Sequence, residues 1–254
     1  MLDSFKNPII FAHRGASAGA PENTLASFSL AVTLGSAAIE LDVQLSADDS
    51  VVVFHDPSVE RTTNGKGKIK DLTLDQIKSL DAGYKFGNAY PAEKIPTLGE
   101  VFSSLSPDIF LNIELKNLTT PSDNLPEEVA KLIQNHHAEH RVLVSSFNPA
   151  SLKQFHNLLP SVPLGRLIYR PFMIDFHRIF SSGLSFYQTV HISIKAFNKR
   201  RIDSLHKLGK YVFIYTLNHP SDILSALNCG ADGFFTDDPA LANKILAENG
   251  YNLS

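Results

Sequence analysis

The feature that most constrains the fold of this sequence is a regular alternation of short apolar runs with stretches of helical periodicity. The alternation continues through the 254 residues without a change of composition that would mark a second domain. Strands that alternate with helices favour a parallel sheet, because each parallel connection has to cross back over one face of that sheet. We therefore expect a single α/β domain over residues 1–254.

Nine apolar runs have the length and the residue types of β-strands. They cover residues 9–12, 38–43, 51–54, 109–115, 142–145, 164–168, 189–194, 211–215 and 233–236. Helical patterns separate most of these runs. The first helix opens at Pro21, and the others cover residues 73–80, 97–105, 125–135, 149–158, 198–208, 221–228 and 239–249.

One of these runs follows its predecessor too closely to pair with it in parallel. Only the turn-rich segment 44–50 separates Val43 from Val51, whereas a parallel crossover needs roughly a dozen residues. The run at 51–54 should therefore fold back as the antiparallel arm of a hairpin. The eight remaining strands predict a (β/α)8 barrel, in which residues 57–95 form a small insertion after the second barrel strand.

Two carboxylates occupy alternate positions of the second predicted strand, with an apolar residue between them. Side chains two residues apart share a face of a strand, so Glu40 and Asp42 point one way while Ile39 and Leu41 point the other. The apolar face suits the surrounding helices, which leaves both carboxylates inside the barrel. Two neighbouring buried anions need compensation, either by a hard metal ion or by protons, as in a paired general acid and base.

A second acidic strand favours the metal ion. On this strand Asn112, Glu114 and Lys116 share the inward face. Glu40, Asp42 and Glu114 together make an oxygen-only site, which is typical of Mg²⁺ or Ca²⁺. The alternative is an internal salt-bridge layer in which Lys116 neutralises one carboxylate, although a single lysine does not offset three acids.

Two histidines and an arginine follow strands at the same end of the predicted barrel. His13 and Arg14 come just after the first strand, at the carboxyl face where barrel enzymes hold their active sites. His55 returns to that face on the hairpin arm. Each residue alone fits a surface loop equally well, so the argument rests on their combination. Cations would neutralise phosphoryl oxygens and histidines would transfer protons, which predicts the cleavage of a phosphate ester.

Charge and composition exclude several other classes of function. The formal net charge is −3 with both signs interspersed, so neither nucleic acid nor an anionic membrane is an expected partner. Cys229 is the only cysteine, which rules out an internal disulfide and a zinc site built on several thiolates. No apolar run reaches the roughly 20 residues that span a bilayer, and the first residues show no signal-peptide pattern. We expect a cytoplasmic protein without membrane insertion.

Taken together, the motifs resemble those of the glycerophosphodiester phosphodiesterase family. In chain order they are His13-Arg-Gly, Pro21-Glu-Asn-Thr-Leu-Ala-Ser-Phe, Glu40-Leu-Asp-Val-Gln-Leu, Val53-Phe-His-Asp, Arg61-Thr-Thr-Asn-Gly-Lys-Gly, Ile95-Pro-Thr-Leu, Asn112-Ile-Glu-Leu-Lys, Ser145-Ser-Phe and Gly233-Phe-Phe-Thr-Asp-Asp-Pro. Each fragment is unspecific by itself. The ordered set extends from His13 to Pro239 and is highly specific.

The resemblance implies a (β/α)8-barrel enzyme that acts on a small-molecule glycerophosphodiester. Its products would be sn-glycerol 3-phosphate and an alcohol such as choline, ethanolamine or glycerol. The resemblance assigns acid–base catalysis to His13 and His55, binding of the phosphodiester to Arg14, and stabilisation of developing charge to Lys116. It implies that a divalent cation, Mg²⁺ or Ca²⁺, is held by Glu40, Asp42 and Glu114.

Two positions depart from the family pattern. The glycine usual in the hairpin turn is absent from Ser46-Ala-Asp-Asp-Ser. Tyr215 is found where the family has tryptophan. We expect Tyr215 and Phe147 to supply the aromatic wall of the substrate site, and the preference for the alcohol to differ accordingly.

Three other functions agree with parts of the pattern. A phosphodiesterase of the lysophospholipase D or sphingomyelinase D type would need an exposed apolar rim for acyl chains, whereas the insertion is rather polar. A catalytically silent binding relative would be expected to lack one of the histidines or acids, and none is missing. A metal-dependent sugar isomerase gives no reason for the pair of His13 and His55. The sequence leaves the alcohol, the cation and the oligomeric state open.

Overall fold

The computed structural model describes residues 8–120, 122–169 and 186–251. Its strands are β1 (Ile9–His13), β2 (Ala38–Leu45), β3 (Val51–Val53), β4 (Phe110–Leu115), β5 (Val142–Ser146), β6 (Leu164–Ile168), β7 (Thr189–Ser193), β8 (Tyr211–Tyr215) and β9 (Gly233–Thr236). Its α-helices are α1 (Leu25–Thr33), α2 (Leu74–Ser79), α3 (Leu98–Ser104), α4 (Leu125–Asn135), α5 (Pro149–Leu158), α7 (Lys199–His206), α8 (Pro220–Asn228) and α9 (Pro239–Glu248). None of the described helices has the length and hydropathy that a membrane span requires. The expectation about a signal peptide falls mainly on residues 1–7, outside the described ranges.

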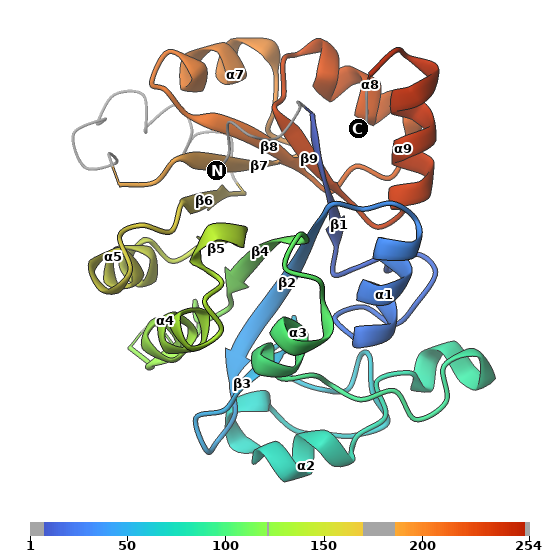
Figure 1. The fold of residues 1–254 in the computed structure, drawn as a ribbon, viewed down its shortest axis with the longest axis vertical. Helices are drawn as coiled ribbons and strands as arrows, with labels where there is room; N and C mark the ends of the chain where they lie inside the picture. Colours follow the sequence, from blue (N-terminus) through green and yellow to red (C-terminus); the bar gives the residue numbers. More distant parts are fainter. Residues whose placement is uncertain (1–7, 121, 170–185, 252–254) are drawn as a thin grey trace.

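The described strands close into a barrel (Figure 1). Parallel pairing runs from β1 through β2, β4, β5, β6, β7, β8 and β9, and β9 pairs with β1 again. Strand β3 lies outside this ring and pairs antiparallel with β2. Eight parallel strands surrounded by helices confirm the predicted (β/α)8 barrel, and the antiparallel β3 confirms the predicted hairpin.

The hairpin between β2 and β3 turns without a glycine. Asp49 adopts a left-handed φ of 59°, which aspartate tolerates because its short side chain bonds locally. The backbone N–H of Ser46 donates to the carbonyl of Ser50 at 3.0 Å, and its hydroxyl oxygen accepts the N–H of Ser50 at 2.9 Å. The departure from the family pattern therefore leaves the turn intact.

Helix α1 begins later than the sequence suggests. The expected start at Pro21 is wrong, because the first helical residue is Leu25. Asn23 adopts a left-handed φ of 58°, which interrupts a helix. Thr24 then caps α1 by accepting the N–H of Ser27 at 3.2 Å. The segment 21–24 is thereby free to reach the carboxyl end of the barrel.

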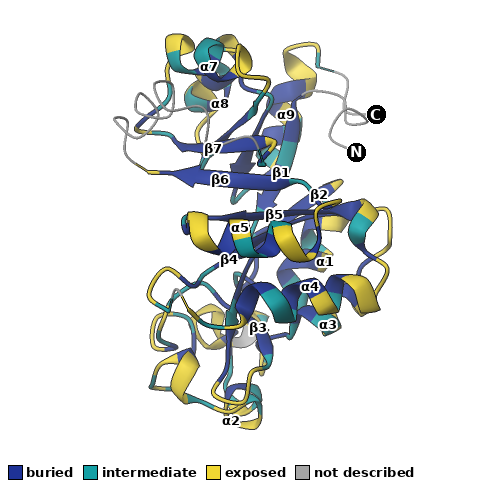
Figure 2. Cartoon of the chain, turned by 90° about the vertical axis from the view of Figure 1, so that its left-hand side faces the viewer, coloured by how far each residue is buried: buried dark blue, intermediate teal, exposed yellow. Residues whose placement is uncertain are grey.

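Two apolar layers hold the barrel together. The outer layer lies between strands and helices and includes Ile39, Leu41 and Ile113. The inner layer, termed here the aromatic floor, fills the amino-terminal half of the barrel with Ile9, Phe11, Ala38, Phe110, Leu143, Phe213 and Phe235. Figure 2 shows the barrel strands buried and the exposed residues on outer helices and loops. The floor closes one end of the barrel and leaves the carboxyl end for polar groups.

The insertion at 57–95 has an apolar core of its own. Its buried members, together with two from the hairpin arm, are Val52, Phe54, Val59, Ile69, Ile77, Ala82 and Ile95. Thr73 caps α2 by accepting the N–H of Gln76, and the side chain of Gln76 accepts the N–H of Thr73 in return. This packing fixes the chain just after β3, where His55 lies.

His191 on β7 is buried among the rings of the aromatic floor. Its ring centroid lies 5.4 Å from that of Phe213 and 5.1 Å from that of Phe235, and its Nε2 lies 2.9 Å from Thr189 Oγ1. Burial disfavours the charged imidazolium and lowers the pKa of His191 to about 3. Gly165 leaves room for this ring, because a Cβ there would lie 2.6 Å from His191 Nε2.

We expect His191 to make the fold less stable in mild acid. Its pKa is 6.5 as a free side chain and about 3 in the fold, so below pH 6.5 the unfolded state takes up a proton that the folded state does not. This group alone should lower the free energy of unfolding by about 1.4 kcal/mol per pH unit below pH 6.5. Urea titrations at pH 7 and pH 5 should show a loss about 2 kcal/mol smaller in His191→Asn than in the wild type. Equal pH dependence in the two proteins would contradict the assignment.

Candidate active site

The carboxyl end of the barrel holds a cavity of about 190 Å³, named the barrel cavity below. Its lining residues are His13, Arg14, Glu40, His55, Asn112, Glu114, Lys116, Phe147, Leu167, His191, Tyr215, Thr216 and Phe235. Eight of the nine site residues expected from the sequence are in this lining. The ninth, Asp42, joins Glu40 and Glu114 in one carboxylate cluster. The structure thus brings the expected set together, and the contacts of each residue indicate what it can do.

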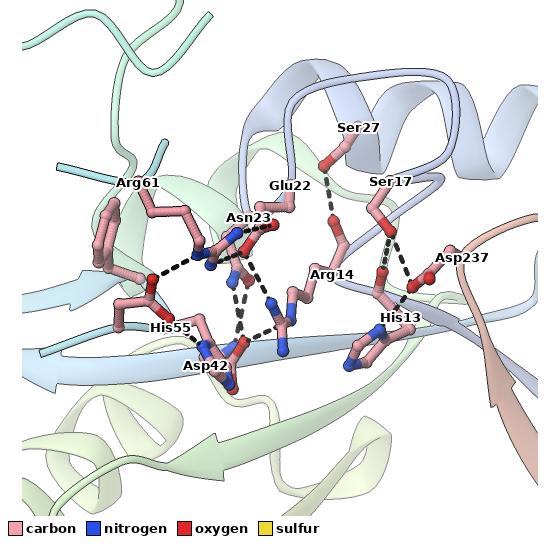
Figure 3. Close-up of polar contacts among 12 residues, drawn as sticks. His13, Arg14, Ser17, Glu22, Asn23, Ser27, Asp42, His55, Arg61 and Asp237 are labelled. Carbon is pink, nitrogen blue, oxygen red and sulfur yellow. Dashed lines mark hydrogen bonds and ion pairs between the residues drawn. The ribbon is translucent and has the colours of Figure 1, made fainter. Parts of the chain in front are cut away.

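His13 ends β1 and is held by a residue from the far end of the chain. Its Nδ1 lies 2.6 Å from Oδ1 of Asp237, which directly follows β9, a neighbour of β1 in the barrel (Figure 3). A carboxylate only accepts, so Nδ1 carries the proton, and Nε2 lies 4.0 Å from Glu40 Oε2. Burial alone would raise the pKa of Asp237, but hydrogen bonds from His13 and Asn218 hold it below its usual value.

His55 follows β3 and has a partner of the same kind. Its Nδ1 lies 2.5 Å from Asp56 Oδ1, so Nδ1 is again the protonated nitrogen. Burial would raise the pKa of Asp56, but Arg61 and His55 lower it. Both histidines therefore line the barrel cavity with Nδ1 bound to a carboxylate, and Nε2 of each is the atom left for proton transfer.

Arg14 has an unusual backbone conformation that its neighbours hold in place. Its φ of 58° lies in the left-handed region that few non-glycine residues adopt. Its N–H donates to Glu40 Oε2 at 3.0 Å, while its carbonyl accepts the N–H of Asn23 at 3.0 Å and the hydroxyl of Ser27 at 2.9 Å. These three bonds determine where the guanidinium lies, and it donates to Glu22 at 2.8 Å.

A chain of ion pairs links Arg14 to the insertion (Figure 3). Glu22 accepts from Arg14 with one oxygen, and from Arg61 with both oxygens at 2.7 Å. Arg61 also donates to Asp56, the partner of His55. Burial would raise the pKa of Glu22, but the two arginines lower it. The guanidinium of Arg61 therefore joins two parts of the site, the segment before α1 and the partner of His55.

Three buried carboxylates meet beside the barrel cavity. Glu40, Asp42 and Glu114 offer oxygens that all lie within 4.8 Å of one another. Sheet register produces this proximity, because Asp42 on β2 is paired with Glu114 on β4. Burial, and then repulsion by the other two carboxylates, raises the pKa of Glu40 well above its usual value. Burial would also raise the pKa of Asp42, but Lys116 and Arg14 hold it well below its usual value.

Lys116 reaches the same carboxylates from the end of β4. Its Nζ lies 2.9 Å from Glu114 Oε1 and 3.6 Å from Asp42 Oδ1. Burial would lower the pKa of Lys116, but these two carboxylates raise it, so the ammonium stays charged. Arg14 Nε lies 3.3 Å from Asp42 Oδ2, yet Arg14 is also shared with Glu22. The two cations therefore do not fully balance the carboxylates around them.

The donor set fits a hard divalent cation. All three candidate ligands are buried and offer oxygen, which Mg²⁺ and Ca²⁺ prefer. A bound cation would remove the repulsion that raises the pKa of Glu40. The salt-bridge layer considered from the sequence is also present, since Lys116 binds Glu114. Among the described residues, however, it leaves Arg14 as the cation that acts on Glu40.

Phe147 and Tyr215 form an aromatic wall of the barrel cavity. Their rings meet edge to face with centroids 6.2 Å apart, and Lys116 Nζ lies 6.0 Å from the centroid of Phe147. The hydroxyl of Tyr215 donates to the carbonyl of Ile168 at 3.1 Å. Burial raises the pKa of Tyr215, so its ring stays neutral. The wall offers apolar ring surface beside the ammonium group.

Several polar residues that support the site belong to the family motifs, but the sequence did not predict what each of them contacts. Glu22 and Asn23 belong to a segment that was interpreted as a helix start. Asp56 directly follows His55, and Asp237 directly follows β9, so both lie at the carboxyl end where barrel sites form. Their position after a strand end is the sequence signal that could have identified them. The adjacent Asp238, by contrast, caps α9 with its side chain.

The sequence matches a known family over most of its length. A model of the glycerophosphoryl diester phosphodiesterase family matches residues 13–241. The chain is 37% identical over 243 residues to a glycerophosphodiester phosphodiesterase of Caldanaerobacter subterraneus subsp. tengcongensis, an alignment that covers 95% of this chain and 99% of that protein. It is 38% identical over 247 residues to a glycerophosphodiester phosphodiesterase of Bacillus altitudinis, covering 94% of this chain and 98% of that protein.

Solved structures share the fold. A phosphodiesterase of Oleispira antarctica, solved in complex with the product sn-glycerol-3-phosphate, aligns with a TM-score of 0.86 and 32% identity over 95% of this chain and 97% of its own. A glycerophosphodiester phosphodiesterase of Thermotoga maritima aligns with a TM-score of 0.77 and 29% identity over 95% of this chain and 99% of its own. Sequence and structure comparisons thus agree with the resemblance seen in the motifs.

We expect a divalent cation to raise the thermal stability of the protein through the three carboxylates. A ligand that binds only the folded state stabilises it by about 2.7 kcal/mol at a hundredfold excess over Kd. Calorimetry in EDTA and in millimolar Mg²⁺ or Ca²⁺ should therefore show a higher Tm with cation. Glu114→Gln should lose this increase, whereas Glu248→Gln, at the exposed end of α9, should keep it. The same increase in Glu114→Gln as in the wild type would mean that the cation binds elsewhere.

Proposed function

Because this chain belongs to the glycerophosphoryl diester phosphodiesterase family, we propose that its barrel cavity hydrolyses glycerophosphodiesters with the help of a divalent cation. One observation carries this proposal. Two histidine–aspartate pairs, two half-buried cationic side chains and three buried carboxylates converge on a single cavity. The products would be sn-glycerol 3-phosphate and an alcohol.

The size of the barrel cavity supports a small substrate. The barrel cavity is small, at about 190 Å³. Such a space suits a phosphate with a small polyol attached. The relative from Oleispira antarctica was solved with sn-glycerol-3-phosphate as its product. We therefore propose glycerophosphocholine and glycerophosphoethanolamine as substrates.

Arg14 and Lys116 would bind the phosphodiester. Both side chains line the barrel cavity. Burial would lower the pKa of each, but the neighbouring carboxylates raise it, so both groups are charged before substrate arrives. A planar guanidinium suits two phosphate oxygens, while an ammonium acts as a point charge. Positive groups fixed in advance lower the free energy of a transition state in which negative charge grows on the phosphoryl oxygens.

His13 and His55 would transfer the protons of the reaction. Asp237 holds one imidazole and Asp56 the other, which leaves Nε2 of each histidine available. One Nε2 would accept a proton from the attacking water, and the other would donate a proton to the oxygen of the leaving alcohol. The carboxylate partner of each histidine stabilises the imidazolium while it carries both protons.

Glu40, Asp42 and Glu114 would hold the cation, Mg²⁺ or Ca²⁺. When bound, it would polarise a phosphoryl oxygen. Asn23 keeps Asp42 oriented for this role, because Nδ2 of Asn23 donates to Asp42 Oδ2 at 2.9 Å. The N–H of Asp42 in turn donates to Asn23 Oδ1 at 3.2 Å. Such support determines where a ligating oxygen points.

A lysophospholipid suits the site less well. An acyl chain would need an apolar groove that continues from the barrel cavity, whereas two openings beside that cavity are lined mostly by polar residues in the part of the chain that the structure describes. One is lined by residues that include Ser46, Asp49, Lys68, Lys70, Thr120 and Asp123. The other is lined by residues that include Ser17, Glu22, Asn218, Asp237 and Asp238.

The cytoplasmic location expected from the sequence stays a prediction.

We expect the purified protein to release glycerol 3-phosphate from glycerophosphocholine only when a divalent cation is present. A coupled assay measures the release before and after treatment with EDTA, and again after Mg²⁺ or Ca²⁺ is restored. Loss and recovery of activity would support both the cation and the reaction. Unchanged activity in EDTA would remove the cation from the proposal. No release from either glycerophosphodiester under any cation would contradict the proposed reaction.

We expect His13→Ala and His55→Ala each to lower kcat by roughly 10²–10⁴-fold, because each removes a proton-transfer group. Asp237→Asn should lower kcat at least about tenfold, because the amide can no longer stabilise the imidazolium of His13. The same coupled assay at saturating substrate measures kcat.

Asp238→Asn is the matched control for Asp237→Asn. Asp238 is the adjacent residue, and its side chain caps α9 rather than a histidine. Asparagine caps helices about as well as aspartate, so this variant should keep both kcat and Tm. If both variants lost activity equally, the effect would come from the loop and not from the pair of His13 and Asp237.

A further inference from the structure

Asn112 lines the barrel cavity with an amide that lacks a protein partner. The residue is 1% exposed, and its Oδ1 has no hydrogen-bond partner in the part of the chain that the structure describes. It lies on β4, paired in register with Glu40 of β2. An unpaired buried amide destabilises the fold, and a bound ligand can make the hydrogen bonds that the protein leaves unmade.

The hydrogen bonds of the neighbouring carboxylates come from groups other than Asn112. Glu40 accepts the backbone N–H of Arg14. Glu114 accepts from the ammonium of Lys116. Asn112 is neutral, so it does not change the balance of charge among these groups. A hydroxyl is a suitable ligand for a neutral amide, because the amide oxygen accepts an O–H and the NH₂ donates to a hydroxyl oxygen. The match holds in either orientation of the amide.

The order of residues along β4 places Asn112 toward the closed end of the barrel. Inward positions run from Phe110 in the aromatic floor, through Asn112 and Glu114, to Lys116 near the opening. A phosphate bound beside Lys116 can send only one of its two ester arms toward the floor. The aromatic floor fills the barrel just beyond Asn112, so that arm is limited to a small group and the larger, variable arm points outward.

We propose that Asn112 hydrogen bonds a hydroxyl of the glycerol arm and thereby makes the barrel cavity selective for glycerol at its closed end. This inference rests on the proposed function. Asn112 is then a specificity residue, which contacts the substrate away from the phosphorus. The leaving alcohol lies at the open end, where it makes no contact with Asn112.

The test pairs removal of the amide with removal of each substrate hydroxyl. The substrates are glycerophosphocholine and two analogues in which the C1 or the C2 hydroxyl of glycerol is replaced by hydrogen. Asn112→Leu and Asn112→Ala should lower kcat/KM for glycerophosphocholine by roughly 10- to 100-fold. The analogue that lacks the paired hydroxyl should be cleaved at similar rates by the wild type and both variants. The two losses are then not additive, which is the signature of a direct contact.

Ser145→Ala is the matched control. Ser145 is buried on β5, pairs in register with Glu114, and also has an unpaired hydroxyl, but it is not in the lining of the barrel cavity. This variant should keep the wild-type ratios of kcat/KM among the three substrates. Leucine has the same branched heavy-atom skeleton as asparagine without its polar atoms, so Asn112→Leu keeps the test valid if alanine destabilises the fold. Thermal melting checks that each variant is folded.

Three results in an active wild-type protein would overturn the inference. One is an additive effect, in which the Asn112 variants lower kcat/KM by the same factor for glycerophosphocholine and for both analogues. The second is an equal fall on all substrates together with a smaller cation-induced increase in Tm, which would make Asn112 a support of the carboxylate cluster. The third is no loss on glycerophosphocholine. A wild-type protein inactive on all glycerophosphodiesters would instead overturn the proposed function, and this inference with it.

Discussion

Repulsion among three buried carboxylates is the interaction around which the rest of the site is arranged. Like charges within 4.8 Å in a buried place cannot all stay ionised without compensation, and the raised pKa of Glu40 expresses that conflict. The left-handed backbone of Arg14 fits the same logic, because it directs an N–H to Glu40 and a guanidinium to Asp42. Lys116 adds a second positive charge from β4. The left-handed conformation of Arg14, its backbone N–H and the two cationic side chains therefore all act on the same three carboxylates.

The aromatic floor strengthens the electrostatic interactions among these groups. Rings of Phe11, Phe213 and Phe235 fill the barrel below the carboxylates and keep water out of it. Electrostatic interactions are stronger in such surroundings than in water, so both the repulsion among acids and the attraction of cations increase. The same surroundings keep the imidazole of His191 neutral. Packing of the aromatic floor thus fixes where each inward side chain of the polar site lies along the barrel axis.

Much of the fold was predictable because strand periodicity and spacing depend on local sequence. Alternation alone placed Glu40 and Asp42 on one face, and the short segment 44–50 identified the antiparallel arm. The support of the histidines was not predictable in this way. His13 and Asp237 are 224 residues apart, and only closure of the barrel brings β1 beside β9. The link from Glu22 to Arg61 likewise depends on a late start of α1, which the left-handed Asn23 produces.

Closure by β9 has a consequence for the synthesis of the protein. A growing chain folds from its amino terminus, and β1 then presents an open edge to which another strand can pair. That edge is covered only when Gly233–Thr236 emerges, late in this sequence. Asp237 emerges at the same stage, so His13 acquires its carboxylate at the moment the sheet loses its free edge. Until this short strand pairs with β1, the growing chain therefore has both an open sheet edge and a His13 without Asp237, and one pairing event completes both.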